Sequence, residues 1–537
     1  MRIVTPTEMQ IIEKKTFEEF NFFESQIIEN VGLEAANWLH EKFIQHNKDV
    51  TSLLFLLGKG NNGADGLAIA RHLINKYAKQ VKVMAFSLYP ENETSTEFKK
   101  QLATAEAFGV RVAQIRSIDD IAAYFFHLVG EPIIIDALFG SGIRLPLANN
   151  IYDVIRFVNE NAKTIVSIDI ATGVEGDTGR TAGSAIKATH TLAIGAAKLG
   201  CFIADGVAHS GEIHLIEAGF PQKLFLEGDK FHITPQSFSQ DFFYRSKYAH
   251  KNINGHTLVI GGSSGLTGAL ILATQSALKV GSGLVTAATW ESNHLEYLVR
   301  QVPEIMSTVI PNDDSSWSNL AEKISRYDAI VVGPGIGLDD RVKTLLRIIL
   351  TKYKGPLVID ADAIKKLDYA EDVALIANRH APTVITPHLG ELAELLKRPK
   401  DSIYKDSMSC LREVVYKTGA IVLLKGPCTS VALPSGKVFF NFSPNEAMAT
   451  GGTGDILAGI LGGLLAQAYA KSRNQIEISQ ISPEIAEQIV LLAIAIHSES
   501  GRLAKQQVGG RGVKASHLMD NFTAAFSSIE NMVYHKH

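Results

Sequence analysis

The chain has few cysteines: only Cys201, Cys410 and Cys428 occur among 537 residues. They lie far apart and form no CxxC pair, so the sequence predicts neither a disulfide framework nor a zinc site, and a reducing cytoplasm fits best. An excess of one charge is also lacking, because the formal net charge is −4 and the basic residues are scattered. We therefore expect no nucleic-acid partner.

Long hydrophobic runs are missing as well. The longest uncharged apolar run, residues 456–470, is shorter than the ~20 residues that a helix needs to cross a bilayer. We expect it to form a buried helix, and we expect no membrane partner. The N-terminal stretch MRIVTPTEMQIIEKKTFEEF is acidic and has no long apolar segment, which argues against a signal peptide.

Short apolar runs alternate with helical patterns in two series. The first series lies at 52–58, 81–87, 132–138, 164–170, 189–195 and 212–218, after a helical segment at 8–47. The second lies at 256–265, 283–289, 327–337, 356–364, 382–391 and 420–426, followed by a hairpin pattern at 429–441 and a helix over about 484–505. This alternation predicts two α/β domains with mostly parallel sheets. We place the boundary near residue 225, which gives domains of 1–225 and 226–537.

The run MATGGTGDILAGILGGLLAQAY, residues 448–469, places the residues GGTG directly before Asp455 and a long apolar helical pattern. The start of a helix carries roughly +0.5 elementary charge and binds phosphate through its free N–H groups. Asp455 then lies in the first turn, where a carboxylate can take a proton from a hydroxyl. This combination predicts phosphoryl transfer to an alcohol. The alternative is a glycine-rich helix start that only packs tightly.

Other strands of the second series also end in glycines or polar groups, at the edge where open α/β sheets bind ligands. GPGIG (333–337) follows one strand, His388 and Glu391 follow another, and Lys425 follows a third. Each has a structural alternative, such as a hydrogen-bonded histidine or a lysine whose ammonium reaches solvent. Their convergence on one edge favours a binding site.

The first series ends its strands in a comparable way. GKGNNGADG (58–66) follows a strand, with glycines that suit a phosphate-binding turn, but its spacing is neither GxGxxG nor a Walker loop. Asp136 and Asp169 lie at two further strand ends, and topology brings Asn62 and Thr172 near them. Their oxygens are hard ligands, so they predict a site for a group I or II cation. The alternative is one helix-capping aspartate and one solvated aspartate.

Motifs in both halves resemble one enzyme family. NNGADG (61–66), DALFGSG (136–142) and SIDIATG (167–173) together resemble the N-terminal epimerase domain of bifunctional NAD(P)H-hydrate repair enzymes. VIGGSSGLTGA, VVGPGIG, DADAI, TPHLGE, LLKGPCT and ATGGTGDILAG resemble their C-terminal dehydratase domain. The resemblance implies an N-terminal Rossmann-like α/β/α sandwich with a parallel sheet and a C-terminal ribokinase-like α/β domain. One departure is Ala171-Thr172, where the family usually has Pro-Ser.

The resemblance implies repair of damaged nicotinamide nucleotides. NADH and NADPH that have gained water across the C5–C6 bond form the hydrates NADHX and NADPHX, with R and S epimers at C6. One domain interconverts the epimers, and the other dehydrates the S form with ADP or ATP and Mg²⁺. The donor phosphorylates the C6 hydroxyl, phosphate then leaves, and ADP becomes AMP. The resemblance also implies a homo-oligomer.

Site residues follow from the same resemblance. Asp455 is the expected base of the dehydratase, and Asp169 is our candidate acid/base of the epimerase. The donor nucleotide is expected at Lys425, Gly426, Pro427, Cys428, Thr429 and Gly454, and the hydrate of the second domain at Ala269, Gly335, Gly337, His388 and Asp455. The hydrate of the first domain is expected at Asn61, Asn62, Gly63, Ala64, Asp65, Gly140, Ser141, Gly142, Ile143, Arg144, Leu145, Pro146 and Asp169, and K⁺ at Asn62, Asp136 and Thr172.

Two other interpretations stay open at this point. A small-molecule kinase of the ribokinase type would also carry GGTGD, although it would have no use for the NNGADG domain. Release of NAD(P)H instead of a phosphorylated product distinguishes the two. The N-terminal half is alternatively a binding module without activity, against which the intact Asn62, Asp136 and Asp169 argue.

Overall fold

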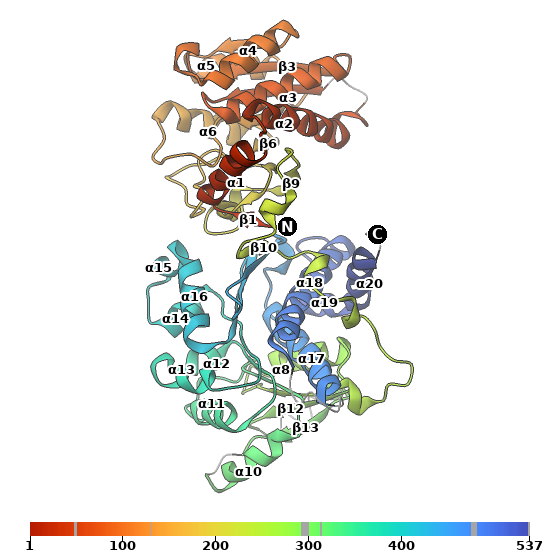
Figure 1. Cartoon of the computed structure of the whole chain (residues 1–537). Coiled ribbons are helices and arrows are strands. Elements are labelled where there is room, and N and C mark those ends of the chain that lie inside the picture. The colour runs from red at the N-terminus through yellow and green to blue at the C-terminus, as the bar shows by residue number, and fades with distance from the viewer. Residues whose placement is uncertain (48–50, 129, 292–299, 312–313, 474–480, 535–537) are drawn as a thin grey trace. The chain divides into compact units, whose positions relative to one another are not determined.

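The computed structural model describes residues 1–47, 51–128, 130–291, 300–311, 314–473 and 481–534 (Figure 1). The chain divides into two units, Met1–Lys230 and Phe231–His537, each with its own sheet and hydrophobic core. The division falls a few residues after the predicted boundary near residue 225. None of the described helices is long and apolar enough to cross a membrane.

The first unit is built on a seven-stranded sheet in which every pair of neighbouring strands is parallel. Its order is β4 (Arg111–Gln114), β3 (Val81–Ser87), β2 (Thr51–Leu57), β5 (Ile133–Ala137), β6 (Thr164–Ile168), β7 (His190–Ile194) and β9 (Glu212–Ile216). All six predicted strands are present. The half-exposed β4 was not predicted, because its four residues carry no continuous apolar run. The winding direction reverses between β2 and β5, which is where such sheets bind ligands.

Helices flank this sheet, and a small parallel pair joins β1 (Ile3–Val4) to β8 (Ala197–Lys198). The helices are α1 (Pro6–Glu19), α2 (Glu24–Leu39), α3 (Asn61–Tyr77), α4 (Thr96–Ala107), α5 (Ile118–Phe126), α6 (Asn149–Asn161) and α7 (Gly206–His209). The predicted helical segment 8–47 is therefore two α-helices and a π-helical turn, His40–Ile44. Gly66 lets α3 lie directly on the sheet, because a Cβ there would come within 2.7 Å of the Cβ of Ala137.

The second unit contains a ten-stranded sheet with an antiparallel edge. Its order is β10 (Lys230–His232), β19 (Val438–Phe442), β18 (Cys428–Ala432), β17 (Ile421–Leu424), β16 (Thr383–Ile385), β15 (Leu357–Ile359), β14 (Ala329–Val332), β11 (His256–Ile260), β12 (Leu284–Thr289) and β13 (Met306–Val309). The predicted hairpin is confirmed as β18 and β19, with Gly436 at a φ of 83° in its turn. The winding direction reverses between β11 and β14.

Two groups of helices lie on either side of this second sheet (Figure 1). One comprises α10 (Asp314–Ser325), α11 (Arg341–Lys352), α12 (Asp362–Lys366), α13 (Tyr369–Ala377), α14 (Leu389–Leu396), α15 (Lys400–Lys405) and α16 (Ser407–Thr418). The other comprises α8 (Thr267–Lys279), α17 (Thr453–Arg473), α18 (Pro483–Val508), α19 (Ala515–Asp520) and α20 (Phe522–Tyr534). The predicted helices at 456–470 and 484–505 correspond to α17 and α18.

Close packing explains the glycines within α17. A Cβ at Gly459 would lie 2.2 Å from the backbone oxygen of Ala273 in α8, and a Cβ at Gly462 would lie 2.2 Å from Val331 in β14. Such distances are impossible for real atoms, so glycine is required for α17 to lie against both elements. Because these contacts hold α17 in the core, its first turn, which contains Asp455, has a fixed place at the sheet.

Candidate active sites

The second unit gathers charged groups at the carboxyl edge of its sheet. Lys425 follows β17, and its Nζ lies 2.6 Å from Oδ1 of Asp360, which follows β15. Thr386, after β16, donates its hydroxyl to the same oxygen at 2.6 Å. Asp360 is only 1% exposed, so its charge is balanced by Lys425 and this hydrogen bond. Lys425 is therefore anchored at the strand ends and does not simply extend into solvent.

The same lysine reaches the start of α17. A Cβ built on Gly454 would lie 3.6 Å from Nζ of Lys425. Gly452, just before the helix, has a φ of 94°, which only glycine adopts easily. This turn leaves the first N–H groups of α17 beside an ammonium group, the arrangement that binds phosphate.

Asp455 lies in the first turn of α17 and is half-buried. Burial raises its pKa to about 7, with the negative charges of Asp360, Asp362 and Glu391 acting in the same direction and Lys425 against them. A carboxyl group with a pKa near 7 is suited to act as a general base at neutral pH, because it is basic enough while about half of it is ionised. The alternative of a helix start that serves packing alone does not account for this cluster of charges.

His388 has a structural role in addition to its predicted one. Its Nδ1 accepts hydrogen bonds from the N–H groups of Gly390 at 2.9 Å and Glu391 at 3.1 Å, so it caps α14. Glu391 completes a capping box by accepting from the N–H of His388 at 2.8 Å. Because Nδ1 accepts, Nε2 carries the proton in the neutral ring. Nε2 of His388 lies 3.3 Å from Oε1 of Glu391, and the side chain of His388 is 53% exposed.

The glycine loop after β14 lies beside the start of α8. Gly335 has a φ of 60°, and a Cβ there would come within 2.5 Å of the oxygen of Leu266 and 3.1 Å of the Cβ of Ala269. Gly337 has a φ of 82° and donates its N–H to Asp362 at 3.2 Å. The structure thus brings Gly335 and Ala269 together at the reversal point between β11 and β14.

In the first unit, Asp136 at the end of β5 is fully buried and holds a hydrogen-bonded network. It accepts from the hydroxyl of Ser167 at 2.7 Å, and from the hydroxyl and N–H of Thr172 at 2.7 and 2.9 Å. Burial raises its pKa, although these hydrogen bonds oppose the shift. Asp136 and Thr172 are therefore direct partners, as expected for two members of one site.

Asn62 is buried, and neither polar atom of its side chain finds a hydrogen-bond partner among the described residues. Its Oδ1 lies near Gly140, where a Cβ would come 3.6 Å from it and 3.3 Å from Oδ2 of Asp169. An unpaired buried amide costs free energy, so this position fits a ligand that supplies the missing interactions. A hard cation at Asn62, Asp136 and Thr172 is such a ligand.

Asp169 follows β6 with a φ of 70°, an uncommon conformation for a residue other than glycine and one found at functional sites. Its Oδ2 accepts the N–H of Ser141 at 3.2 Å, which ties it to the predicted substrate loop. Its Oδ1 pairs with Nζ of Lys198, a lysine that is 2% exposed. Lys198 was not predicted, because it lies in the two-residue strand β8 and belongs to no motif.

Two further carboxyl groups surround this pair. Burial raises the pKa of Asp65 in α3 well above its usual range, with Asp169 and Glu13 adding to the shift. Burial likewise raises the pKa of Glu13 in α1 to about 7, against the effect of Lys198. Glu13 was not predicted, because its helix precedes the sheet and carries no recognisable motif. The site therefore holds proton-carrying groups near neutral pH.

The remaining predicted residues lie in exposed or half-exposed loops or near helix starts. Asn61 begins α3 and donates to Glu24 at 2.5 Å. The loop of Gly140 to Pro146 is half-exposed to exposed, with Arg144 turned to solvent. In the second unit, Gly426, Pro427 and Thr429 surround the start of β18, whereas Cys428 is buried, which raises the pKa of its thiol. Cys428 is thus placed to contribute its backbone.

Comparison with known proteins agrees with this two-site arrangement. Residues 257–524 match the family model described as NAD(P)H-hydrate dehydratase, and residues 24–200 match that of the YjeF-related protein N-terminus. The chain is 31% identical to the "Bifunctional NAD(P)H-hydrate repair enzyme Nnr" of Moorella thermoacetica over 99% of this chain and 98% of that protein. The chain belongs to the family of bifunctional NAD(P)H-hydrate repair enzymes.

Another family member, from Escherichia coli, is also 31% identical, over 90% of this chain and 85% of its own. A solved structure of the ADP/ATP-dependent NAD(P)H-hydrate dehydratase of Bacillus subtilis, co-crystallised with ATP and Mg²⁺, is 24% identical, covers 54% of this chain and 97% of its own, and has a TM-score of 0.45. The predicted fold class, family, repair function and enzyme class are confirmed. The individual site residues stay predictions.

Proposed function

We propose that the second unit of this repair enzyme dehydrates the S hydrate of NADH or NADPH by phosphorylating its C6 hydroxyl, with Asp455 as the base. The observation that carries the proposal is the Asp455 carboxyl, with a pKa of about 7, in the first turn of α17 beside Lys425. The base removes the hydroxyl proton as oxygen attacks the terminal phosphorus of the donor. Phosphate is a better leaving group than hydroxide, so it departs from C6 while C5 loses a proton to solvent, and the C5–C6 double bond is restored.

Binding of the donor follows from the same arrangement. Lys425 and the N–H groups at Gly454 are placed to hold the phosphates, with Gly426, Pro427, Cys428 and Thr429 contacting the nucleotide. The donor is ADP or ATP, and Mg²⁺ bound to its phosphates supplies charge neutralisation while retaining water ligands. The hydrate lies against Ala269, Gly335, Gly337 and the exposed ring of His388.

In the first unit we propose that Asp169 moves a proton during epimerisation of the hydrate at C6. Lys198 pairs with Asp169, and the raised pKa values of Asp65 and Glu13 favour their protonated forms, whose protons the reaction can use. Asn61 to Asp65 and the loop Gly140 to Pro146 hold the substrate. K⁺ at Asn62, Asp136 and Thr172 orders the site through oxygen ligands, a role supported by the unpaired amide of Asn62.

We also propose that the protein is a homo-oligomer and that it is located in the cytoplasm. All three cysteines are free and buried, as suits a reducing compartment. Large hydrophobic side chains are exposed in the first unit, including Phe23 at 67% and Phe126 at 66%, and assembly would cover them.

The test is an Asp455→Asn variant of the full chain, assayed separately on pure R and pure S hydrate with ADP or ATP. We expect dehydration to fall by about 10²- to 10⁴-fold, the usual contribution of a general base, while R and S hydrates still interconvert. Asp401→Asn, an exposed position in α15, is the matched control and keeps both activities.

The products decide between repair and the kinase alternative. A repair enzyme releases NAD(P)H, seen by its near-ultraviolet absorbance, and phosphate. Accumulation of a stable phosphorylated hydrate without NAD(P)H would contradict the dehydratase mechanism, as would full dehydration by Asp455→Asn.

A further inference from the structure

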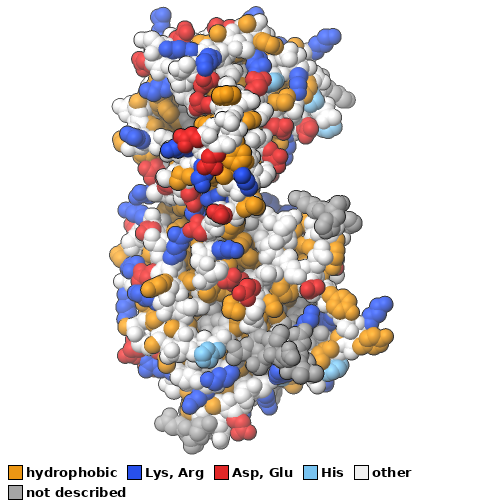
Figure 2. Space-filling model, in the orientation of Figure 1, with side chains coloured by type: hydrophobic (Ala, Val, Ile, Leu, Met, Phe, Trp, Pro, Cys, Tyr) orange, Lys and Arg blue, Asp and Glu red, His pale blue; other side chains and the backbone are white. Residues whose placement is uncertain are grey.

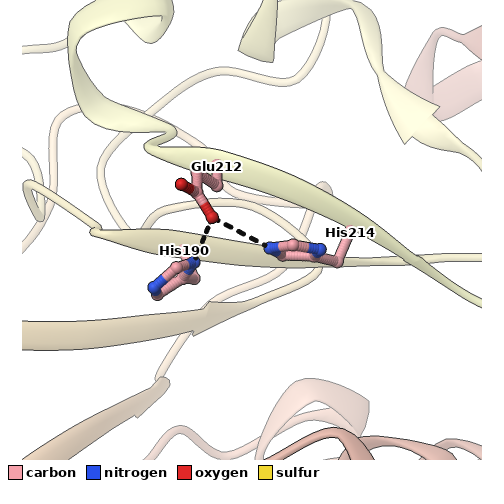
Figure 3. Close-up of side chains that lie close together, drawn as sticks. All are labelled: His190, Glu212 and His214. Carbon is pink, nitrogen blue, oxygen red and sulfur yellow. Dashed lines mark ion pairs between the residues drawn. The ribbon is translucent and has the colours of Figure 1, made fainter. Parts of the chain in front are cut away.

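Two histidines and a glutamate meet at the amino ends of β7 and β9 in the first unit (Figure 3). Strand register places His190 opposite Glu212, and His214 follows two residues later on the same face of β9. Their ligand atoms all lie within 4.8 Å of one another. Asp136 and Asp169 lie at the carboxyl edge of the same sheet, so this cluster is separate from the epimerase site.

The spacing of the three atoms suits a metal ion. Nδ1 of His190 lies 3.4 Å from Oε2 of Glu212, and Nε2 of His214 lies 3.6 Å from that oxygen. Two ligand atoms bound to zinc at ~2.0–2.1 Å in a tetrahedral arrangement lie about 3.3 Å apart. The strands therefore hold Glu212 at this separation from both histidine nitrogens, and the two nitrogens lie within 4.8 Å of each other.

Both histidine nitrogens are buried, and neither has a hydrogen-bond partner among the residues that the structure describes. Burial lowers the pKa of His190 and of His214. An imidazole nitrogen without a hydrogen-bond partner can offer its lone pair to a metal. The carboxylate of Glu212 stabilises a neutral imidazole only weakly. A cation bound to all three side chains would therefore stabilise the cluster most.

Neighbouring side chains orient the two imidazoles, and the cluster is open to solvent on the side of Glu212. The ring of Trp38 lies 4.7 Å from that of His214 and 5.4 Å from that of His190, centre to centre, which fixes both imidazoles. The side chain of Glu212 is 65% exposed, which leaves a route from solvent. Nζ of Lys42 lies 3.5 Å from Oε2 of Glu212 but is itself 43% exposed, so it can turn away when an ion enters.

We propose that His190, Glu212 and His214 form a binding site for a first-row divalent cation, Zn²⁺ above all, with water as the fourth ligand. Two imidazoles and a carboxylate are a ligand set that zinc accepts, with one position left open. The ion connects the edge strand β9 to β7 and stabilises the sheet edge. The scarcity of cysteine argued only against thiolate sites, and the prediction of no zinc site did not consider histidines from two strands.

The test titrates Zn²⁺ into metal-free full-length protein against a chromogenic chelator, comparing the wild type with Glu212→Gln. Glu212 is exposed, so this variant is expected to fold normally, which circular dichroism checks. We expect the wild type to bind one more equivalent than the variant. The variant's affinity at this site falls by more than about 100-fold, the upper end of what loss of an outer-sphere partner costs.

Two further variants sharpen the result. His127→Gln, an exposed histidine of the same unit, is the matched control and keeps the equivalent. Lys42→Gln is expected to tighten zinc binding, because it removes the positive charge that competes for Glu212. If Lys42 only stabilised the fold, Lys42→Gln would not increase the affinity for zinc.

Trp38 offers an independent readout. Co²⁺ bound at the cluster quenches its fluorescence in the wild type and not in Glu212→Gln, whereas Trp290 and Trp317 of the second unit are unaffected. Equal stoichiometry and affinity in the wild type and Glu212→Gln would overturn the proposal, and so would the absence of any zinc binding to the wild type at micromolar concentrations.

Discussion

Nζ of Lys425 lies 2.6 Å from Oδ1 of Asp360, and this buried pair adjoins Asp455. The two charges act on Asp455 in opposite directions, since Asp360 raises its pKa and Lys425 lowers it. Asp360, in the DADAI segment, was not predicted as a site residue, although it follows a predicted strand. Burial is the main cause of the raised pKa of Asp455, and the charge of Asp360 adds to it without any need to touch the substrate.

Dehydration is expected to depend on pH through Asp455. Because the base must be ionised, kcat/KM for dehydration rises as pH increases through about 7 and levels off above it. Asp362→Asn removes a negative charge that raises the pKa of Asp455, so the rising limb moves to lower pH, by at most about one unit. Steady-state rates across a pH series measure this. If the rising part of the pH profile did not move in Asp362→Asn, or moved equally in Asp401→Asn, the assignment of Asp455 as the base would be contradicted.

Epimerisation is expected to depend on Asp169. In Asp169→Asn, interconversion of the hydrates falls by about 10²- to 10⁴-fold because the proton-transferring group is lost, and dehydration of pure S hydrate continues. Chromatography of the two epimers measures the rate. Asp153→Asn, an exposed position in α6, is the matched control. Full epimerisation by an Asp169→Asn variant that still binds hydrate would show that the role is wrong.

The cation site predicts a dependence on K⁺. We expect epimerisation by the wild type to be faster in KCl than in LiCl at equal ionic strength, because oxygen ligands spaced for a larger ion fit Li⁺ poorly. Asn62→Ala removes one ligand and is expected to need more than about tenfold more K⁺. Dehydration of S hydrate by the same variant serves as the internal control. Equal epimerisation rates of the wild type in KCl and in LiCl would contradict the proposed K⁺ site.

Packing of α17 is testable through its glycines. Gly459→Ala forces a Cβ against the backbone of α8, so we expect it to lower the free energy of unfolding of the second unit by about 1–3 kcal/mol. Gly268→Ala is the matched control, because a Cβ there meets no described atom within 4 Å and its φ is not positive. It is expected to stabilise by about 0.4–1 kcal/mol. Urea denaturation compares them, and equal midpoints would contradict the packing argument.

The charged side chains on the surface indicate less about function than the buried charged groups do. Figure 2 shows lysine and arginine interspersed with aspartate and glutamate on the face it draws. This agrees with the scattered charges of the sequence.

The sequence by itself determined the two α/β units, most of their strands, and the identity of residues at the strand ends. These follow from local patterns, because apolar runs predict buried strands and glycines mark the turns after them. It also predicted that Asp455 lies in the first turn of a helix and that Asp136 and Thr172 belong to one site.

Only the tertiary structure decided which charges meet. Lys198 reaches Asp169, Glu13 and Asp65 share their surroundings, and Asp360 pairs with Lys425, although each partner comes from a different element. The pKa of Asp455 and the unpaired amide of Asn62 depend on what excludes water around them. Burial and charge proximity are properties of the packed chain, so no local pattern carries them.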